Sequence, residues 1–303
     1  MGKEGKVLRE FQEFLSKLEP ADEDELEDLF LQFLDEHNGG IASGHMKQIP
    51  EDAFDFLELA ENAKTKKDKL KYISQALELE PRNLDALVMQ ASVDAKGIDQ
   101  FYDLLQPILL EGERQLREQG YFEHDMGDFW LVHETRPYMR AREESFSALI
   151  ELGRMKKAVE DGEELLKLCT NDNLGIRYRL MHLYAYLEDA EDAVQLHKRY
   201  DDYDETQMLL PLSVLYYKLG DLEAAGGYLS RLAKRNKDAK RFFSAATKDQ
   251  LDEYYEELTP YGYRAASIGE LLYCVIENEF LYDAVPYFYS WADSQLRPKK
   301  KKT

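Results

Sequence analysis

Leucine, aromatic and other apolar residues recur at spacings of three and four along most of the chain, and charged residues fill many of the positions between them. This period matches one face of an α-helix rather than the alternation of a half-buried strand. No stretch alternates apolar and polar residues over a strand's length beside an Asn-Gly or Asp-Gly turn, the usual signature of a hairpin. The pattern therefore predicts an all-α protein.

Within this pattern one unit recurs: a leucine-rich helix, a short turn, and a second helix with an alanine near its start. Four good copies span residues 145–168, 179–200, 211–232 and 271–291, and their alanines are Ala158, Ala193, Ala225 and Ala284. The small alanine lets the second helix approach the first closely, and Gly153 and Gly220 permit tight turns. The alanines are 35, 32 and 59 residues apart, so the last interval predicts an insertion with a helix at about 238–258.

A weaker copy ends in ALELEPRN, where Pro81 stops its second helix and Lys69 replaces the alanine. An interval near 34 residues, with these small and aromatic positions, resembles the tetratricopeptide repeat. The resemblance covers roughly residues 50–296. It implies an α-solenoid of antiparallel helix pairs with a right-handed superhelical course, in which at least three pairs stack because no pair can bury its own apolar face.

A closer resemblance is carried by GDFWLVHETRPYMRA and NDNLGIRY. These segments are similar to a group of uncharacterised bacterial tetratricopeptide proteins. The wider stretch 104–203, with Lys-Arg-Tyr-Asp-Asp at 198–202, remotely resembles the eukaryotic family named for suppression of tumorigenicity. Both resemblances imply a helical-repeat scaffold, and neither brings catalytic residues to this chain.

The ends of the chain differ from the repeats. Residues 3–18 and 22–36 predict two amphipathic helices, which we interpret as a helical hairpin or cap within 1–42 that is followed by a linker at 43–49. Residues 297–303 form a basic tail that we expect to be disordered. The charged N-terminus has no hydrophobic segment of a secretory signal, and no stretch approaches the length of a membrane span. We expect a cytoplasmic protein.

The chain carries 39 basic and 60 acidic residues, a net charge of −21. A field of that sign repels phosphate backbones and anionic lipids, so neither a nucleic acid nor a membrane is an expected partner. The basic stretch between Arg231 and Arg241 is a local exception, which we interpret mainly as cations at a helix C-terminus. Docking of a partner there is the alternative.

The ETRPYMRA segment is the first candidate binding site. Pro137 suits the start of a helix, so Arg136 and Arg140 lie one turn apart, beside the aromatic Trp130 and Tyr138. Arginine forks bind carboxylates or phosphates, and aromatic rings stack on them. The cluster therefore suits an acidic or phosphorylated peptide. The alternative is structural, with the arginines paired to nearby glutamates and the rings in the core.

A second candidate follows from the repeat register, because the first helix of each tetratricopeptide pair lines the concave groove. The register places these residues at groove-facing positions: Arg140, Glu143, Tyr178, His182, Gln207 and Tyr217. Asn171 or Asn173 is the predicted N-cap of the helix that carries Arg177 and Tyr178. The alternative interpretation is capping together with ordinary exposed side chains.

Other chemistry finds little support in the sequence. Cys169 and Cys274 are predicted to be buried free thiols, because apolar residues adjoin both and no CxxC pair is present. His124 and His133 lack a third ligand at metal-binding spacing, and the acidic run 201–205 lacks the pattern of a calcium loop. No nucleophile elbow, phosphate-binding loop or zinc-protease motif occurs. We expect no cofactor, no metal and no catalytic activity.

These observations predict a non-catalytic adaptor that binds a peptide or helix of a protein partner in its concave groove. The alternative is self-association, with a homodimer whose groove is filled by its own N-terminal helices or basic tail.

Overall fold

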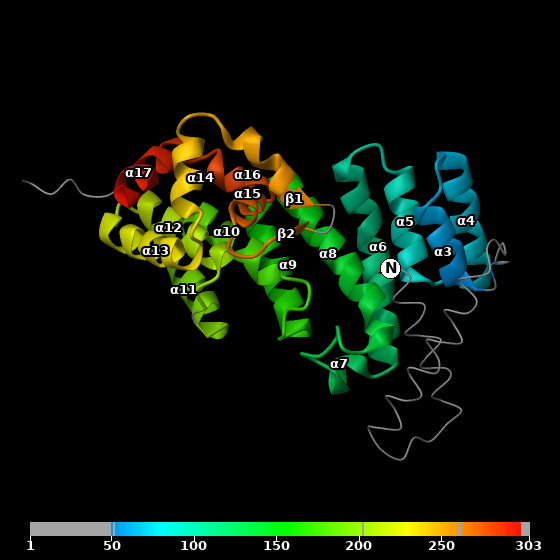
Figure 1. The fold of residues 1–303 in the computed structure, drawn as a ribbon. Helices are drawn as coiled ribbons and strands as arrows, with labels where there is room; N and C mark the ends of the chain where they lie inside the picture. The colour runs from blue at the N-terminus through cyan, green and yellow to red at the C-terminus, as the bar shows by residue number, and fades with distance from the viewer. Residues whose placement is uncertain (1–49, 51, 202, 260–261, 298–303) are drawn as a thin grey trace, which may run out of the picture. The chain divides into compact units, whose positions relative to one another are not determined.

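A computed structural model of the protein describes residues 50, 52–201, 203–259 and 262–297 (Figure 1). The predicted N-terminal hairpin at 1–42, the linker at 43–49 and the tail after Arg297 lie outside the described residues. The chain divides into two compact units, Met1–Val93 and Asp94–Thr303. The described part of both is mostly helical.

The first unit contains helices α3 (Ala53–Glu61), α4 (Lys66–Leu79) and α5 (Leu84–Asp94), the last of which ends at the unit boundary. α3 and α4 begin at side-chain caps, because Asp52 accepts a hydrogen bond from the Asp55 amide at 2.9 Å and Thr65 accepts one from Asp68 at 3.1 Å. α4 ends two residues before Pro81, as the sequence predicts. α3 and α4 pack against each other over a small core.

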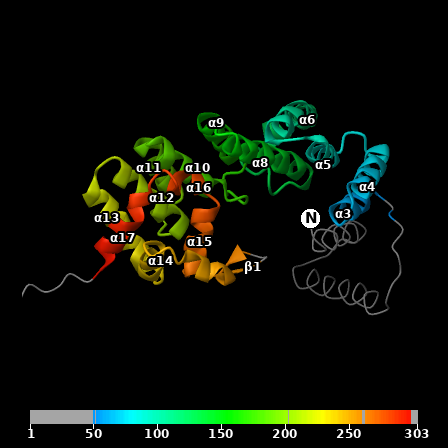
Figure 2. The ribbon, with the colours of Figure 1, turned by 90° about the horizontal axis from the view of Figure 1, so that it is seen from above.

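The second unit contains most of the helices (Figure 1; Figure 2). In chain order its elements are α6 (Ile98–Glu118), α7 (Tyr121–His124), the 3₁₀ helix η1 (His133–Thr135), α8 (Arg136–Glu151), α9 (Met155–Leu168), α10 (Ile176–Leu187), α11 (Ala190–Arg199), α12 (Thr206–Lys218), α13 (Leu222–Arg235), α14 (Ala239–Ala246), the 3₁₀ helix η2 (Leu251–Glu257), β1 (Leu258–Thr259), β2 (Gly262–Tyr263), α15 (Ile268–Ile276), α16 (Glu279–Tyr282) and α17 (Pro286–Leu296).

Three consecutive helix pairs form the centre of this unit: α8 with α9, α10 with α11, and α12 with α13. α10 also packs on α9 and on α12, which joins the pairs into one array. Each pair turns at a residue with positive φ, and five residues later a fully buried alanine begins the contact between its helices. The turn residues are Gly153, Glu188 and Gly220, and the alanines are Ala158, Ala193 and Ala225.

The last predicted copy, residues 271–291, does not fold as a helix pair. Ala284 is exposed and lies between α16 and α17, outside any helix. α17 begins at Pro286 and packs against α14 and α13 rather than pairing with α15. A proline at the start of α17 fits a new helix, because its ring sets φ and its missing N–H is not needed there.

The predicted inserted helix at about 238–258 is shorter in the structure. α14 ends at Ala246, and Asp249 adopts a positive φ of 58° before the 3₁₀ helix η2 begins. β1 and β2 then form a short antiparallel ribbon in which Leu258 pairs with Tyr263. The insertion is therefore part helix, part turn and ribbon, and it carries Tyr263 toward α12 and α15.

Two further expectations concern the cysteines and the membrane. Cys169 and Cys274 are both buried and free, as predicted. In the described ranges, no helix combines the length and the apolar character that crossing a membrane requires.

Candidate functional site

Side chains from the first helices of three consecutive pairs line one pocket of about 600 Å³. Glu143 comes from α8, Tyr178 from α10 and Gln207 from α12, and all three are among the predicted groove positions. We call this the α8–α10–α12 pocket. Its other lining residues are Leu174, Gly175, Arg179, Gly262, Tyr263, Tyr273, Glu277 and Asn278.

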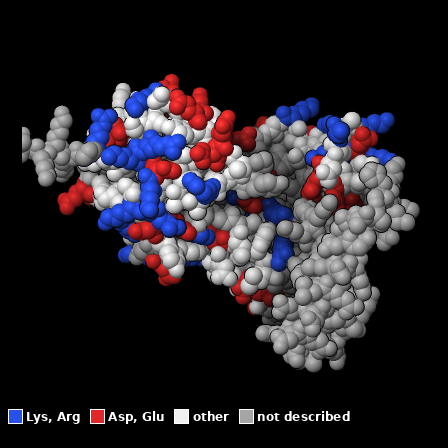
Figure 3. Space-filling view, viewed as in Figure 1, with Lys and Arg blue, Asp and Glu red and all other residues white. Residues whose placement is uncertain are grey.

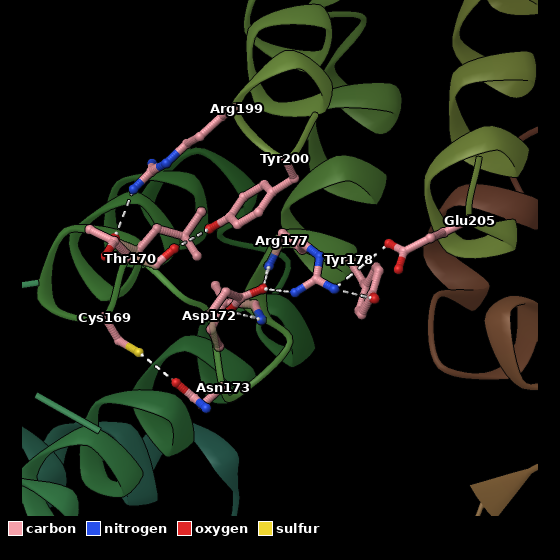
Figure 4. A network of polar contacts seen from close by, with 11 residues as sticks. Cys169, Thr170, Asp172, Asn173, Arg177, Tyr178, Arg199, Tyr200 and Glu205 are labelled. Atoms are coloured by element: carbon pink, nitrogen blue, oxygen red, sulfur yellow. Dashed lines mark hydrogen bonds and ion pairs between the residues drawn. The ribbon is translucent and has the colours of Figure 1, made fainter. Parts of the chain in front are cut away.

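The start of α10 sets one wall of the pocket (Figure 4). The carboxylate of Asp172 accepts hydrogen bonds from the amides of Ile176 at 2.7 Å and Arg177 at 3.1 Å. Asp172 thus satisfies the first amides of the helix, and the predicted caps Asn171 and Asn173 do not. The reason is the turn: Asp172 adopts a positive φ of 52°, which directs the carboxylate at the helix end.

Arg177 fixes the position of Tyr178 from outside the pocket lining. Its guanidinium forms an ion pair with the buried Asp172 at 3.0 Å and lies over the rings of Tyr178 and Tyr200, at 4.1 and 5.1 Å from their centroids (Figure 4). It also donates a hydrogen bond to the Tyr178 hydroxyl. Burial raises the pKa of Tyr178 against the opposing charge of Arg177. The ring is therefore a neutral, firmly held wall of the pocket.

Arg179 joins α8 to α10 at the pocket. It donates hydrogen bonds to Glu143 at 2.6 Å and to Ser147 at 2.7 Å, and its guanidinium lies 4.8 Å from the centroid of the Phe146 ring. The ion pair with Glu143 offsets the charge of this arginine, and two of its N–H donors are engaged. Arg179 is therefore a poor receptor for a further anion.

The ribbon and α15 supply the opposite wall. The hydroxyl of Tyr263 accepts a hydrogen bond from Gln207 Nε2 at 2.7 Å, so the ribbon covers this predicted groove position. The rings of Tyr263 and Tyr273 lie 4.9 Å apart, tilted by 43°. Burial raises the pKa of both tyrosines, which keeps both neutral. Three tyrosine rings thus contribute to a single pocket.

Two polar residues after α15 complete the lining. Asn278 is buried, with 1% of its surface exposed, and its Nδ2 donates to the Cys274 carbonyl at 2.9 Å. Its Oδ1 atom is buried without a hydrogen-bond partner. Neighbouring Glu277 is exposed and forms no ion pair with any described residue. The lining thus holds one acceptor and one carboxylate that the described residues leave without a donor.

His182, a predicted groove residue, is instead in the core. Its exposed fraction is 0%, because α15 and α16 cover this face of α10. Nδ1 donates to the Tyr178 carbonyl at 2.7 Å, so Nε2 is the acceptor that faces the Tyr282 hydroxyl at 3.0 Å and the Cys274 thiol at 3.3 Å.

Burial keeps this His182–Cys274–Tyr282 cluster neutral. It lowers the pKa of His182 to about 4 and raises that of Cys274 to about 12. A nucleophilic cysteine needs a thiolate beside an imidazolium and access to substrate. In this pair, burial favours the neutral thiol and the neutral imidazole, and neither side chain has exposed surface.

The ETRPYMRA cluster forms a packed loop and helix start. Arg136 Nε donates to the Trp130 carbonyl at 2.8 Å and lies over its ring, while Tyr138 is 1% exposed. The half-buried Arg142 forms an ion pair with Asp161 of α9, at 3.0 Å, and not with a nearby glutamate. Arg140 is half-buried on the same helix. None of these residues lines the α8–α10–α12 pocket.

Tyr217 also lies away from the pocket. It is half-buried at the end of α12 and packs on Phe288 and Trp291 of α17, with ring centroids 5.4 and 5.1 Å away. The sequence does not predict this contact, because α17 was expected to pair with α15. Tyr217 therefore contributes to the core between α12 and α17.

The remaining candidates are charged segments rather than sites in which several side chains converge. Figure 3 shows lysine and arginine side chains gathered over α13 and α14, where Arg231 donates to Asp204 at 2.8 Å. Asp204 belongs to the acidic run 201–205, so part of that run pairs with the basic stretch. Among the described residues, no group of three or more His, Cys, Asp or Glu side chains is arranged to hold a metal ion.

Sequence reasoning missed most of the pocket lining. The register matches Glu143 with Tyr178, 35 residues later, and therefore contained no signal for the neighbouring Arg179. Tyr263, Tyr273 and Asn278 come from the insertion and the irregular last copy, where no register applies. Comparison with protein-family models, with curated proteins and with solved structures found no match.

Proposed function

We propose that this protein is a non-catalytic scaffold of tetratricopeptide type, an adaptor that binds a peptide or helix of a protein partner. One observation carries the proposal: the first helices of three consecutive pairs each place a side chain, Glu143, Tyr178 and Gln207, in the same pocket. A surface built in this way from successive repeats suits an extended ligand that crosses several helices.

The spacing of the pairs supports the repeat assignment. The buried alanines Ala158, Ala193 and Ala225 stand 35 and 32 residues apart, close to the tetratricopeptide period of about 34. Each follows a positive-φ turn residue by five positions. This regularity links sequence period and backbone conformation in all three pairs.

The pocket also has the composition of a binding site. Tyrosine offers a large, rigid contact surface at low cost in side-chain entropy, and tyrosine and arginine are enriched among residues that dominate binding energy. Three tyrosines line this pocket. Its volume of about 600 Å³ lies within the range of ligand pockets in proteins.

The test is selection of binding peptides from a displayed random library against the full chain. Affinities of the selected peptides are then compared between wild type, a pocket variant carrying Tyr178→Ala and Tyr273→Ala, and a control carrying Tyr287→Ala. Tyr287 is 78% exposed on α17 and lies outside the pocket. Circular dichroism and thermal unfolding establish that each variant is folded.

We expect peptides that bind wild type and the control equally and the pocket variant at least about tenfold more weakly, the loss that removing two aromatic contacts implies. Peptides that bind all three proteins equally would refute the pocket as their site. Light scattering on the same samples tests the alternative: a dimer that excludes the selected peptides would favour self-association.

A further inference from the structure

The charge of the α8–α10–α12 pocket disfavours an anionic ligand. The sequence suggests an acidic or phosphorylated ligand for the ETRPYMRA cluster, which does not line this pocket. The pocket lining contains two carboxylates, Glu143 and Glu277, against the single guanidinium of Arg179. The lining therefore carries a net charge of −1. The whole chain adds a field of the same sign, with a net charge of −21. Both disfavour an anion.

The one cation among the lining residues is already paired. Arg179 pairs with Glu143 at 2.6 Å, donates to Ser147 at 2.7 Å and lies over the Phe146 ring. Glu277, in contrast, is exposed and has no ion-pair partner among the described residues. The unbalanced charge of the pocket is therefore that of one carboxylate.

The rings and the amide in the lining have matching chemistry. The faces of aromatic rings are negative and attract lysine and arginine side chains. Tyr263 and Tyr273 line the pocket with their ring centroids 4.9 Å apart, whereas the Tyr178 ring already has the Arg177 guanidinium over it, 4.1 Å from its centroid. Asn278, on the same lining, has an Oδ1 atom without a hydrogen-bond donor. Rings, carboxylate and carbonyl oxygen all favour a cationic donor.

We infer that the α8–α10–α12 pocket takes the cationic side chain of a lysine or arginine in the partner peptide, beside the Tyr263 and Tyr273 rings and the Glu277 carboxylate. This inference rests on the proposed function, and it names the chemistry of the residue that the groove recognises. A long aliphatic stem suits the tyrosine walls, while the charged end meets Glu277. The partner's recognition segment is therefore basic.

The test uses short blocked peptides that differ only at one central position: lysine, arginine, norleucine or glutamate. Norleucine retains the aliphatic stem of lysine and lacks its charge. Binding to the full chain is measured by NMR titration, following the side-chain amide of Asn278 and the backbone amide of Tyr273. The proteins are wild type, Glu277→Gln, and the control Glu223→Gln, which removes an exposed carboxylate on α13 outside the pocket.

We expect the lysine and arginine peptides to bind wild type about tenfold more tightly than the norleucine peptide, the combined size of a cation–π contact and an ion pair. The glutamate peptide should bind most weakly. Glu277→Gln should reduce the preference for lysine over norleucine several-fold, and Glu223→Gln should leave it unchanged. Added salt should weaken binding of the lysine peptide and not that of norleucine.

Three results would overturn the inference: equal binding of the lysine and norleucine peptides, no binding of either cationic peptide, or a lysine preference that Glu277→Gln leaves intact. The proposed function is judged separately by the displayed library. Selected peptides that need Tyr178 and Tyr273 but contain no conserved basic residue would retain the adaptor and refute the cationic pocket. Selected peptides that ignore both tyrosines would refute the function itself.

Discussion

The buried His182 makes a quantitative prediction about the stability of the fold in mild acid. Its imidazole has no exposed surface, and its neighbours Cys274 and Tyr282 are neutral because burial raises the pKa of both. Among the described residues, its partners are a carbonyl, a hydroxyl and a thiol, and no carboxylate accepts a hydrogen bond from it. The pKa therefore falls from its ordinary 6.5 to about 4 in the folded state. In the unfolded chain it returns to the ordinary value.

The sign follows from which state binds the proton. Between pH 6.5 and 4 the unfolded histidine is charged and the folded one is neutral, so acid stabilises the unfolded state. The contribution of neutral His182 to stability is complete above pH 6.5 and is lost as the pH falls toward 4. Relative to pH 8, the free energy of unfolding drops by about 2 kcal/mol at pH 5 and by about 3 kcal/mol at pH 4.

Urea unfolding at pH 8, 6 and 5 measures this effect in wild type, His182→Gln and the control His133→Gln, whose histidine is exposed in η1. Other groups titrate in the same range, so the quantity of interest is the difference between proteins. His182→Gln should be less stable at pH 8 but should lose about 2 kcal/mol less than wild type between pH 8 and pH 5. His133→Gln should follow wild type. Parallel losses in wild type and His182→Gln would refute the reasoning.

Further predictions concern packing, the start of α10 and the thiols. Gly162→Ala should destabilise by about 1–3 kcal/mol, because its new Cβ would lie 3.0 Å from a ring of α8 and 3.2 Å from a leucine methyl of α10. Gly227→Ala meets no atom within 4 Å, so it should stabilise by about 0.5–1 kcal/mol; urea unfolding that gives both changes the same sign would contradict the packing argument. Asp172→Ala should cost about 2–3 kcal/mol in the same assay, since a half-buried guanidinium loses one of its two carboxylate partners and two amides lose their acceptor; a loss below about 1 kcal/mol, the value of an exposed pair, would contradict it. Cys169 and Cys274 should react with a thiol reagent only as the chain unfolds; fast labelling of the native protein would show that one is accessible.

The regular part of the fold could be predicted because local and tertiary requirements coincide there. In the three central pairs, the apolar period, the turn residue and the small alanine all specify the same helix pair, and Gly153 and Gly220 adopt the positive φ that their position suggests. After α13 these signals no longer coincide. α14 ends at Ala246, and Asp249 takes a positive φ three residues later, although no local sequence pattern marks this aspartate as a turn residue.

The candidate site was predictable only where it lies on that regular part. The register located Glu143, Tyr178 and Gln207, since a repeat places equivalent positions on one face. It misplaced His182, because whether a groove position is open depends on what covers it, and α15 and α16 return over α10 from about 90 residues later in the chain. This packing depends on tertiary contacts between segments far apart in the sequence, and no local sequence pattern predicts them.

The packing of α15 and α16 on α10 also connects the pocket to the core. Tyr178 contributes its ring to the pocket and its carbonyl to His182 Nδ1, at 2.7 Å. Asn278 lines the pocket and donates to the carbonyl of Cys274, whose thiol lies 3.3 Å from His182 Nε2. Two walls of the pocket thus attach to opposite sides of one neutral, buried imidazole. Because those hydrogen bonds fix both the tautomer of the imidazole and the spacing of α10 from α15, the shape of the pocket depends on His182 even though no ligand can reach it.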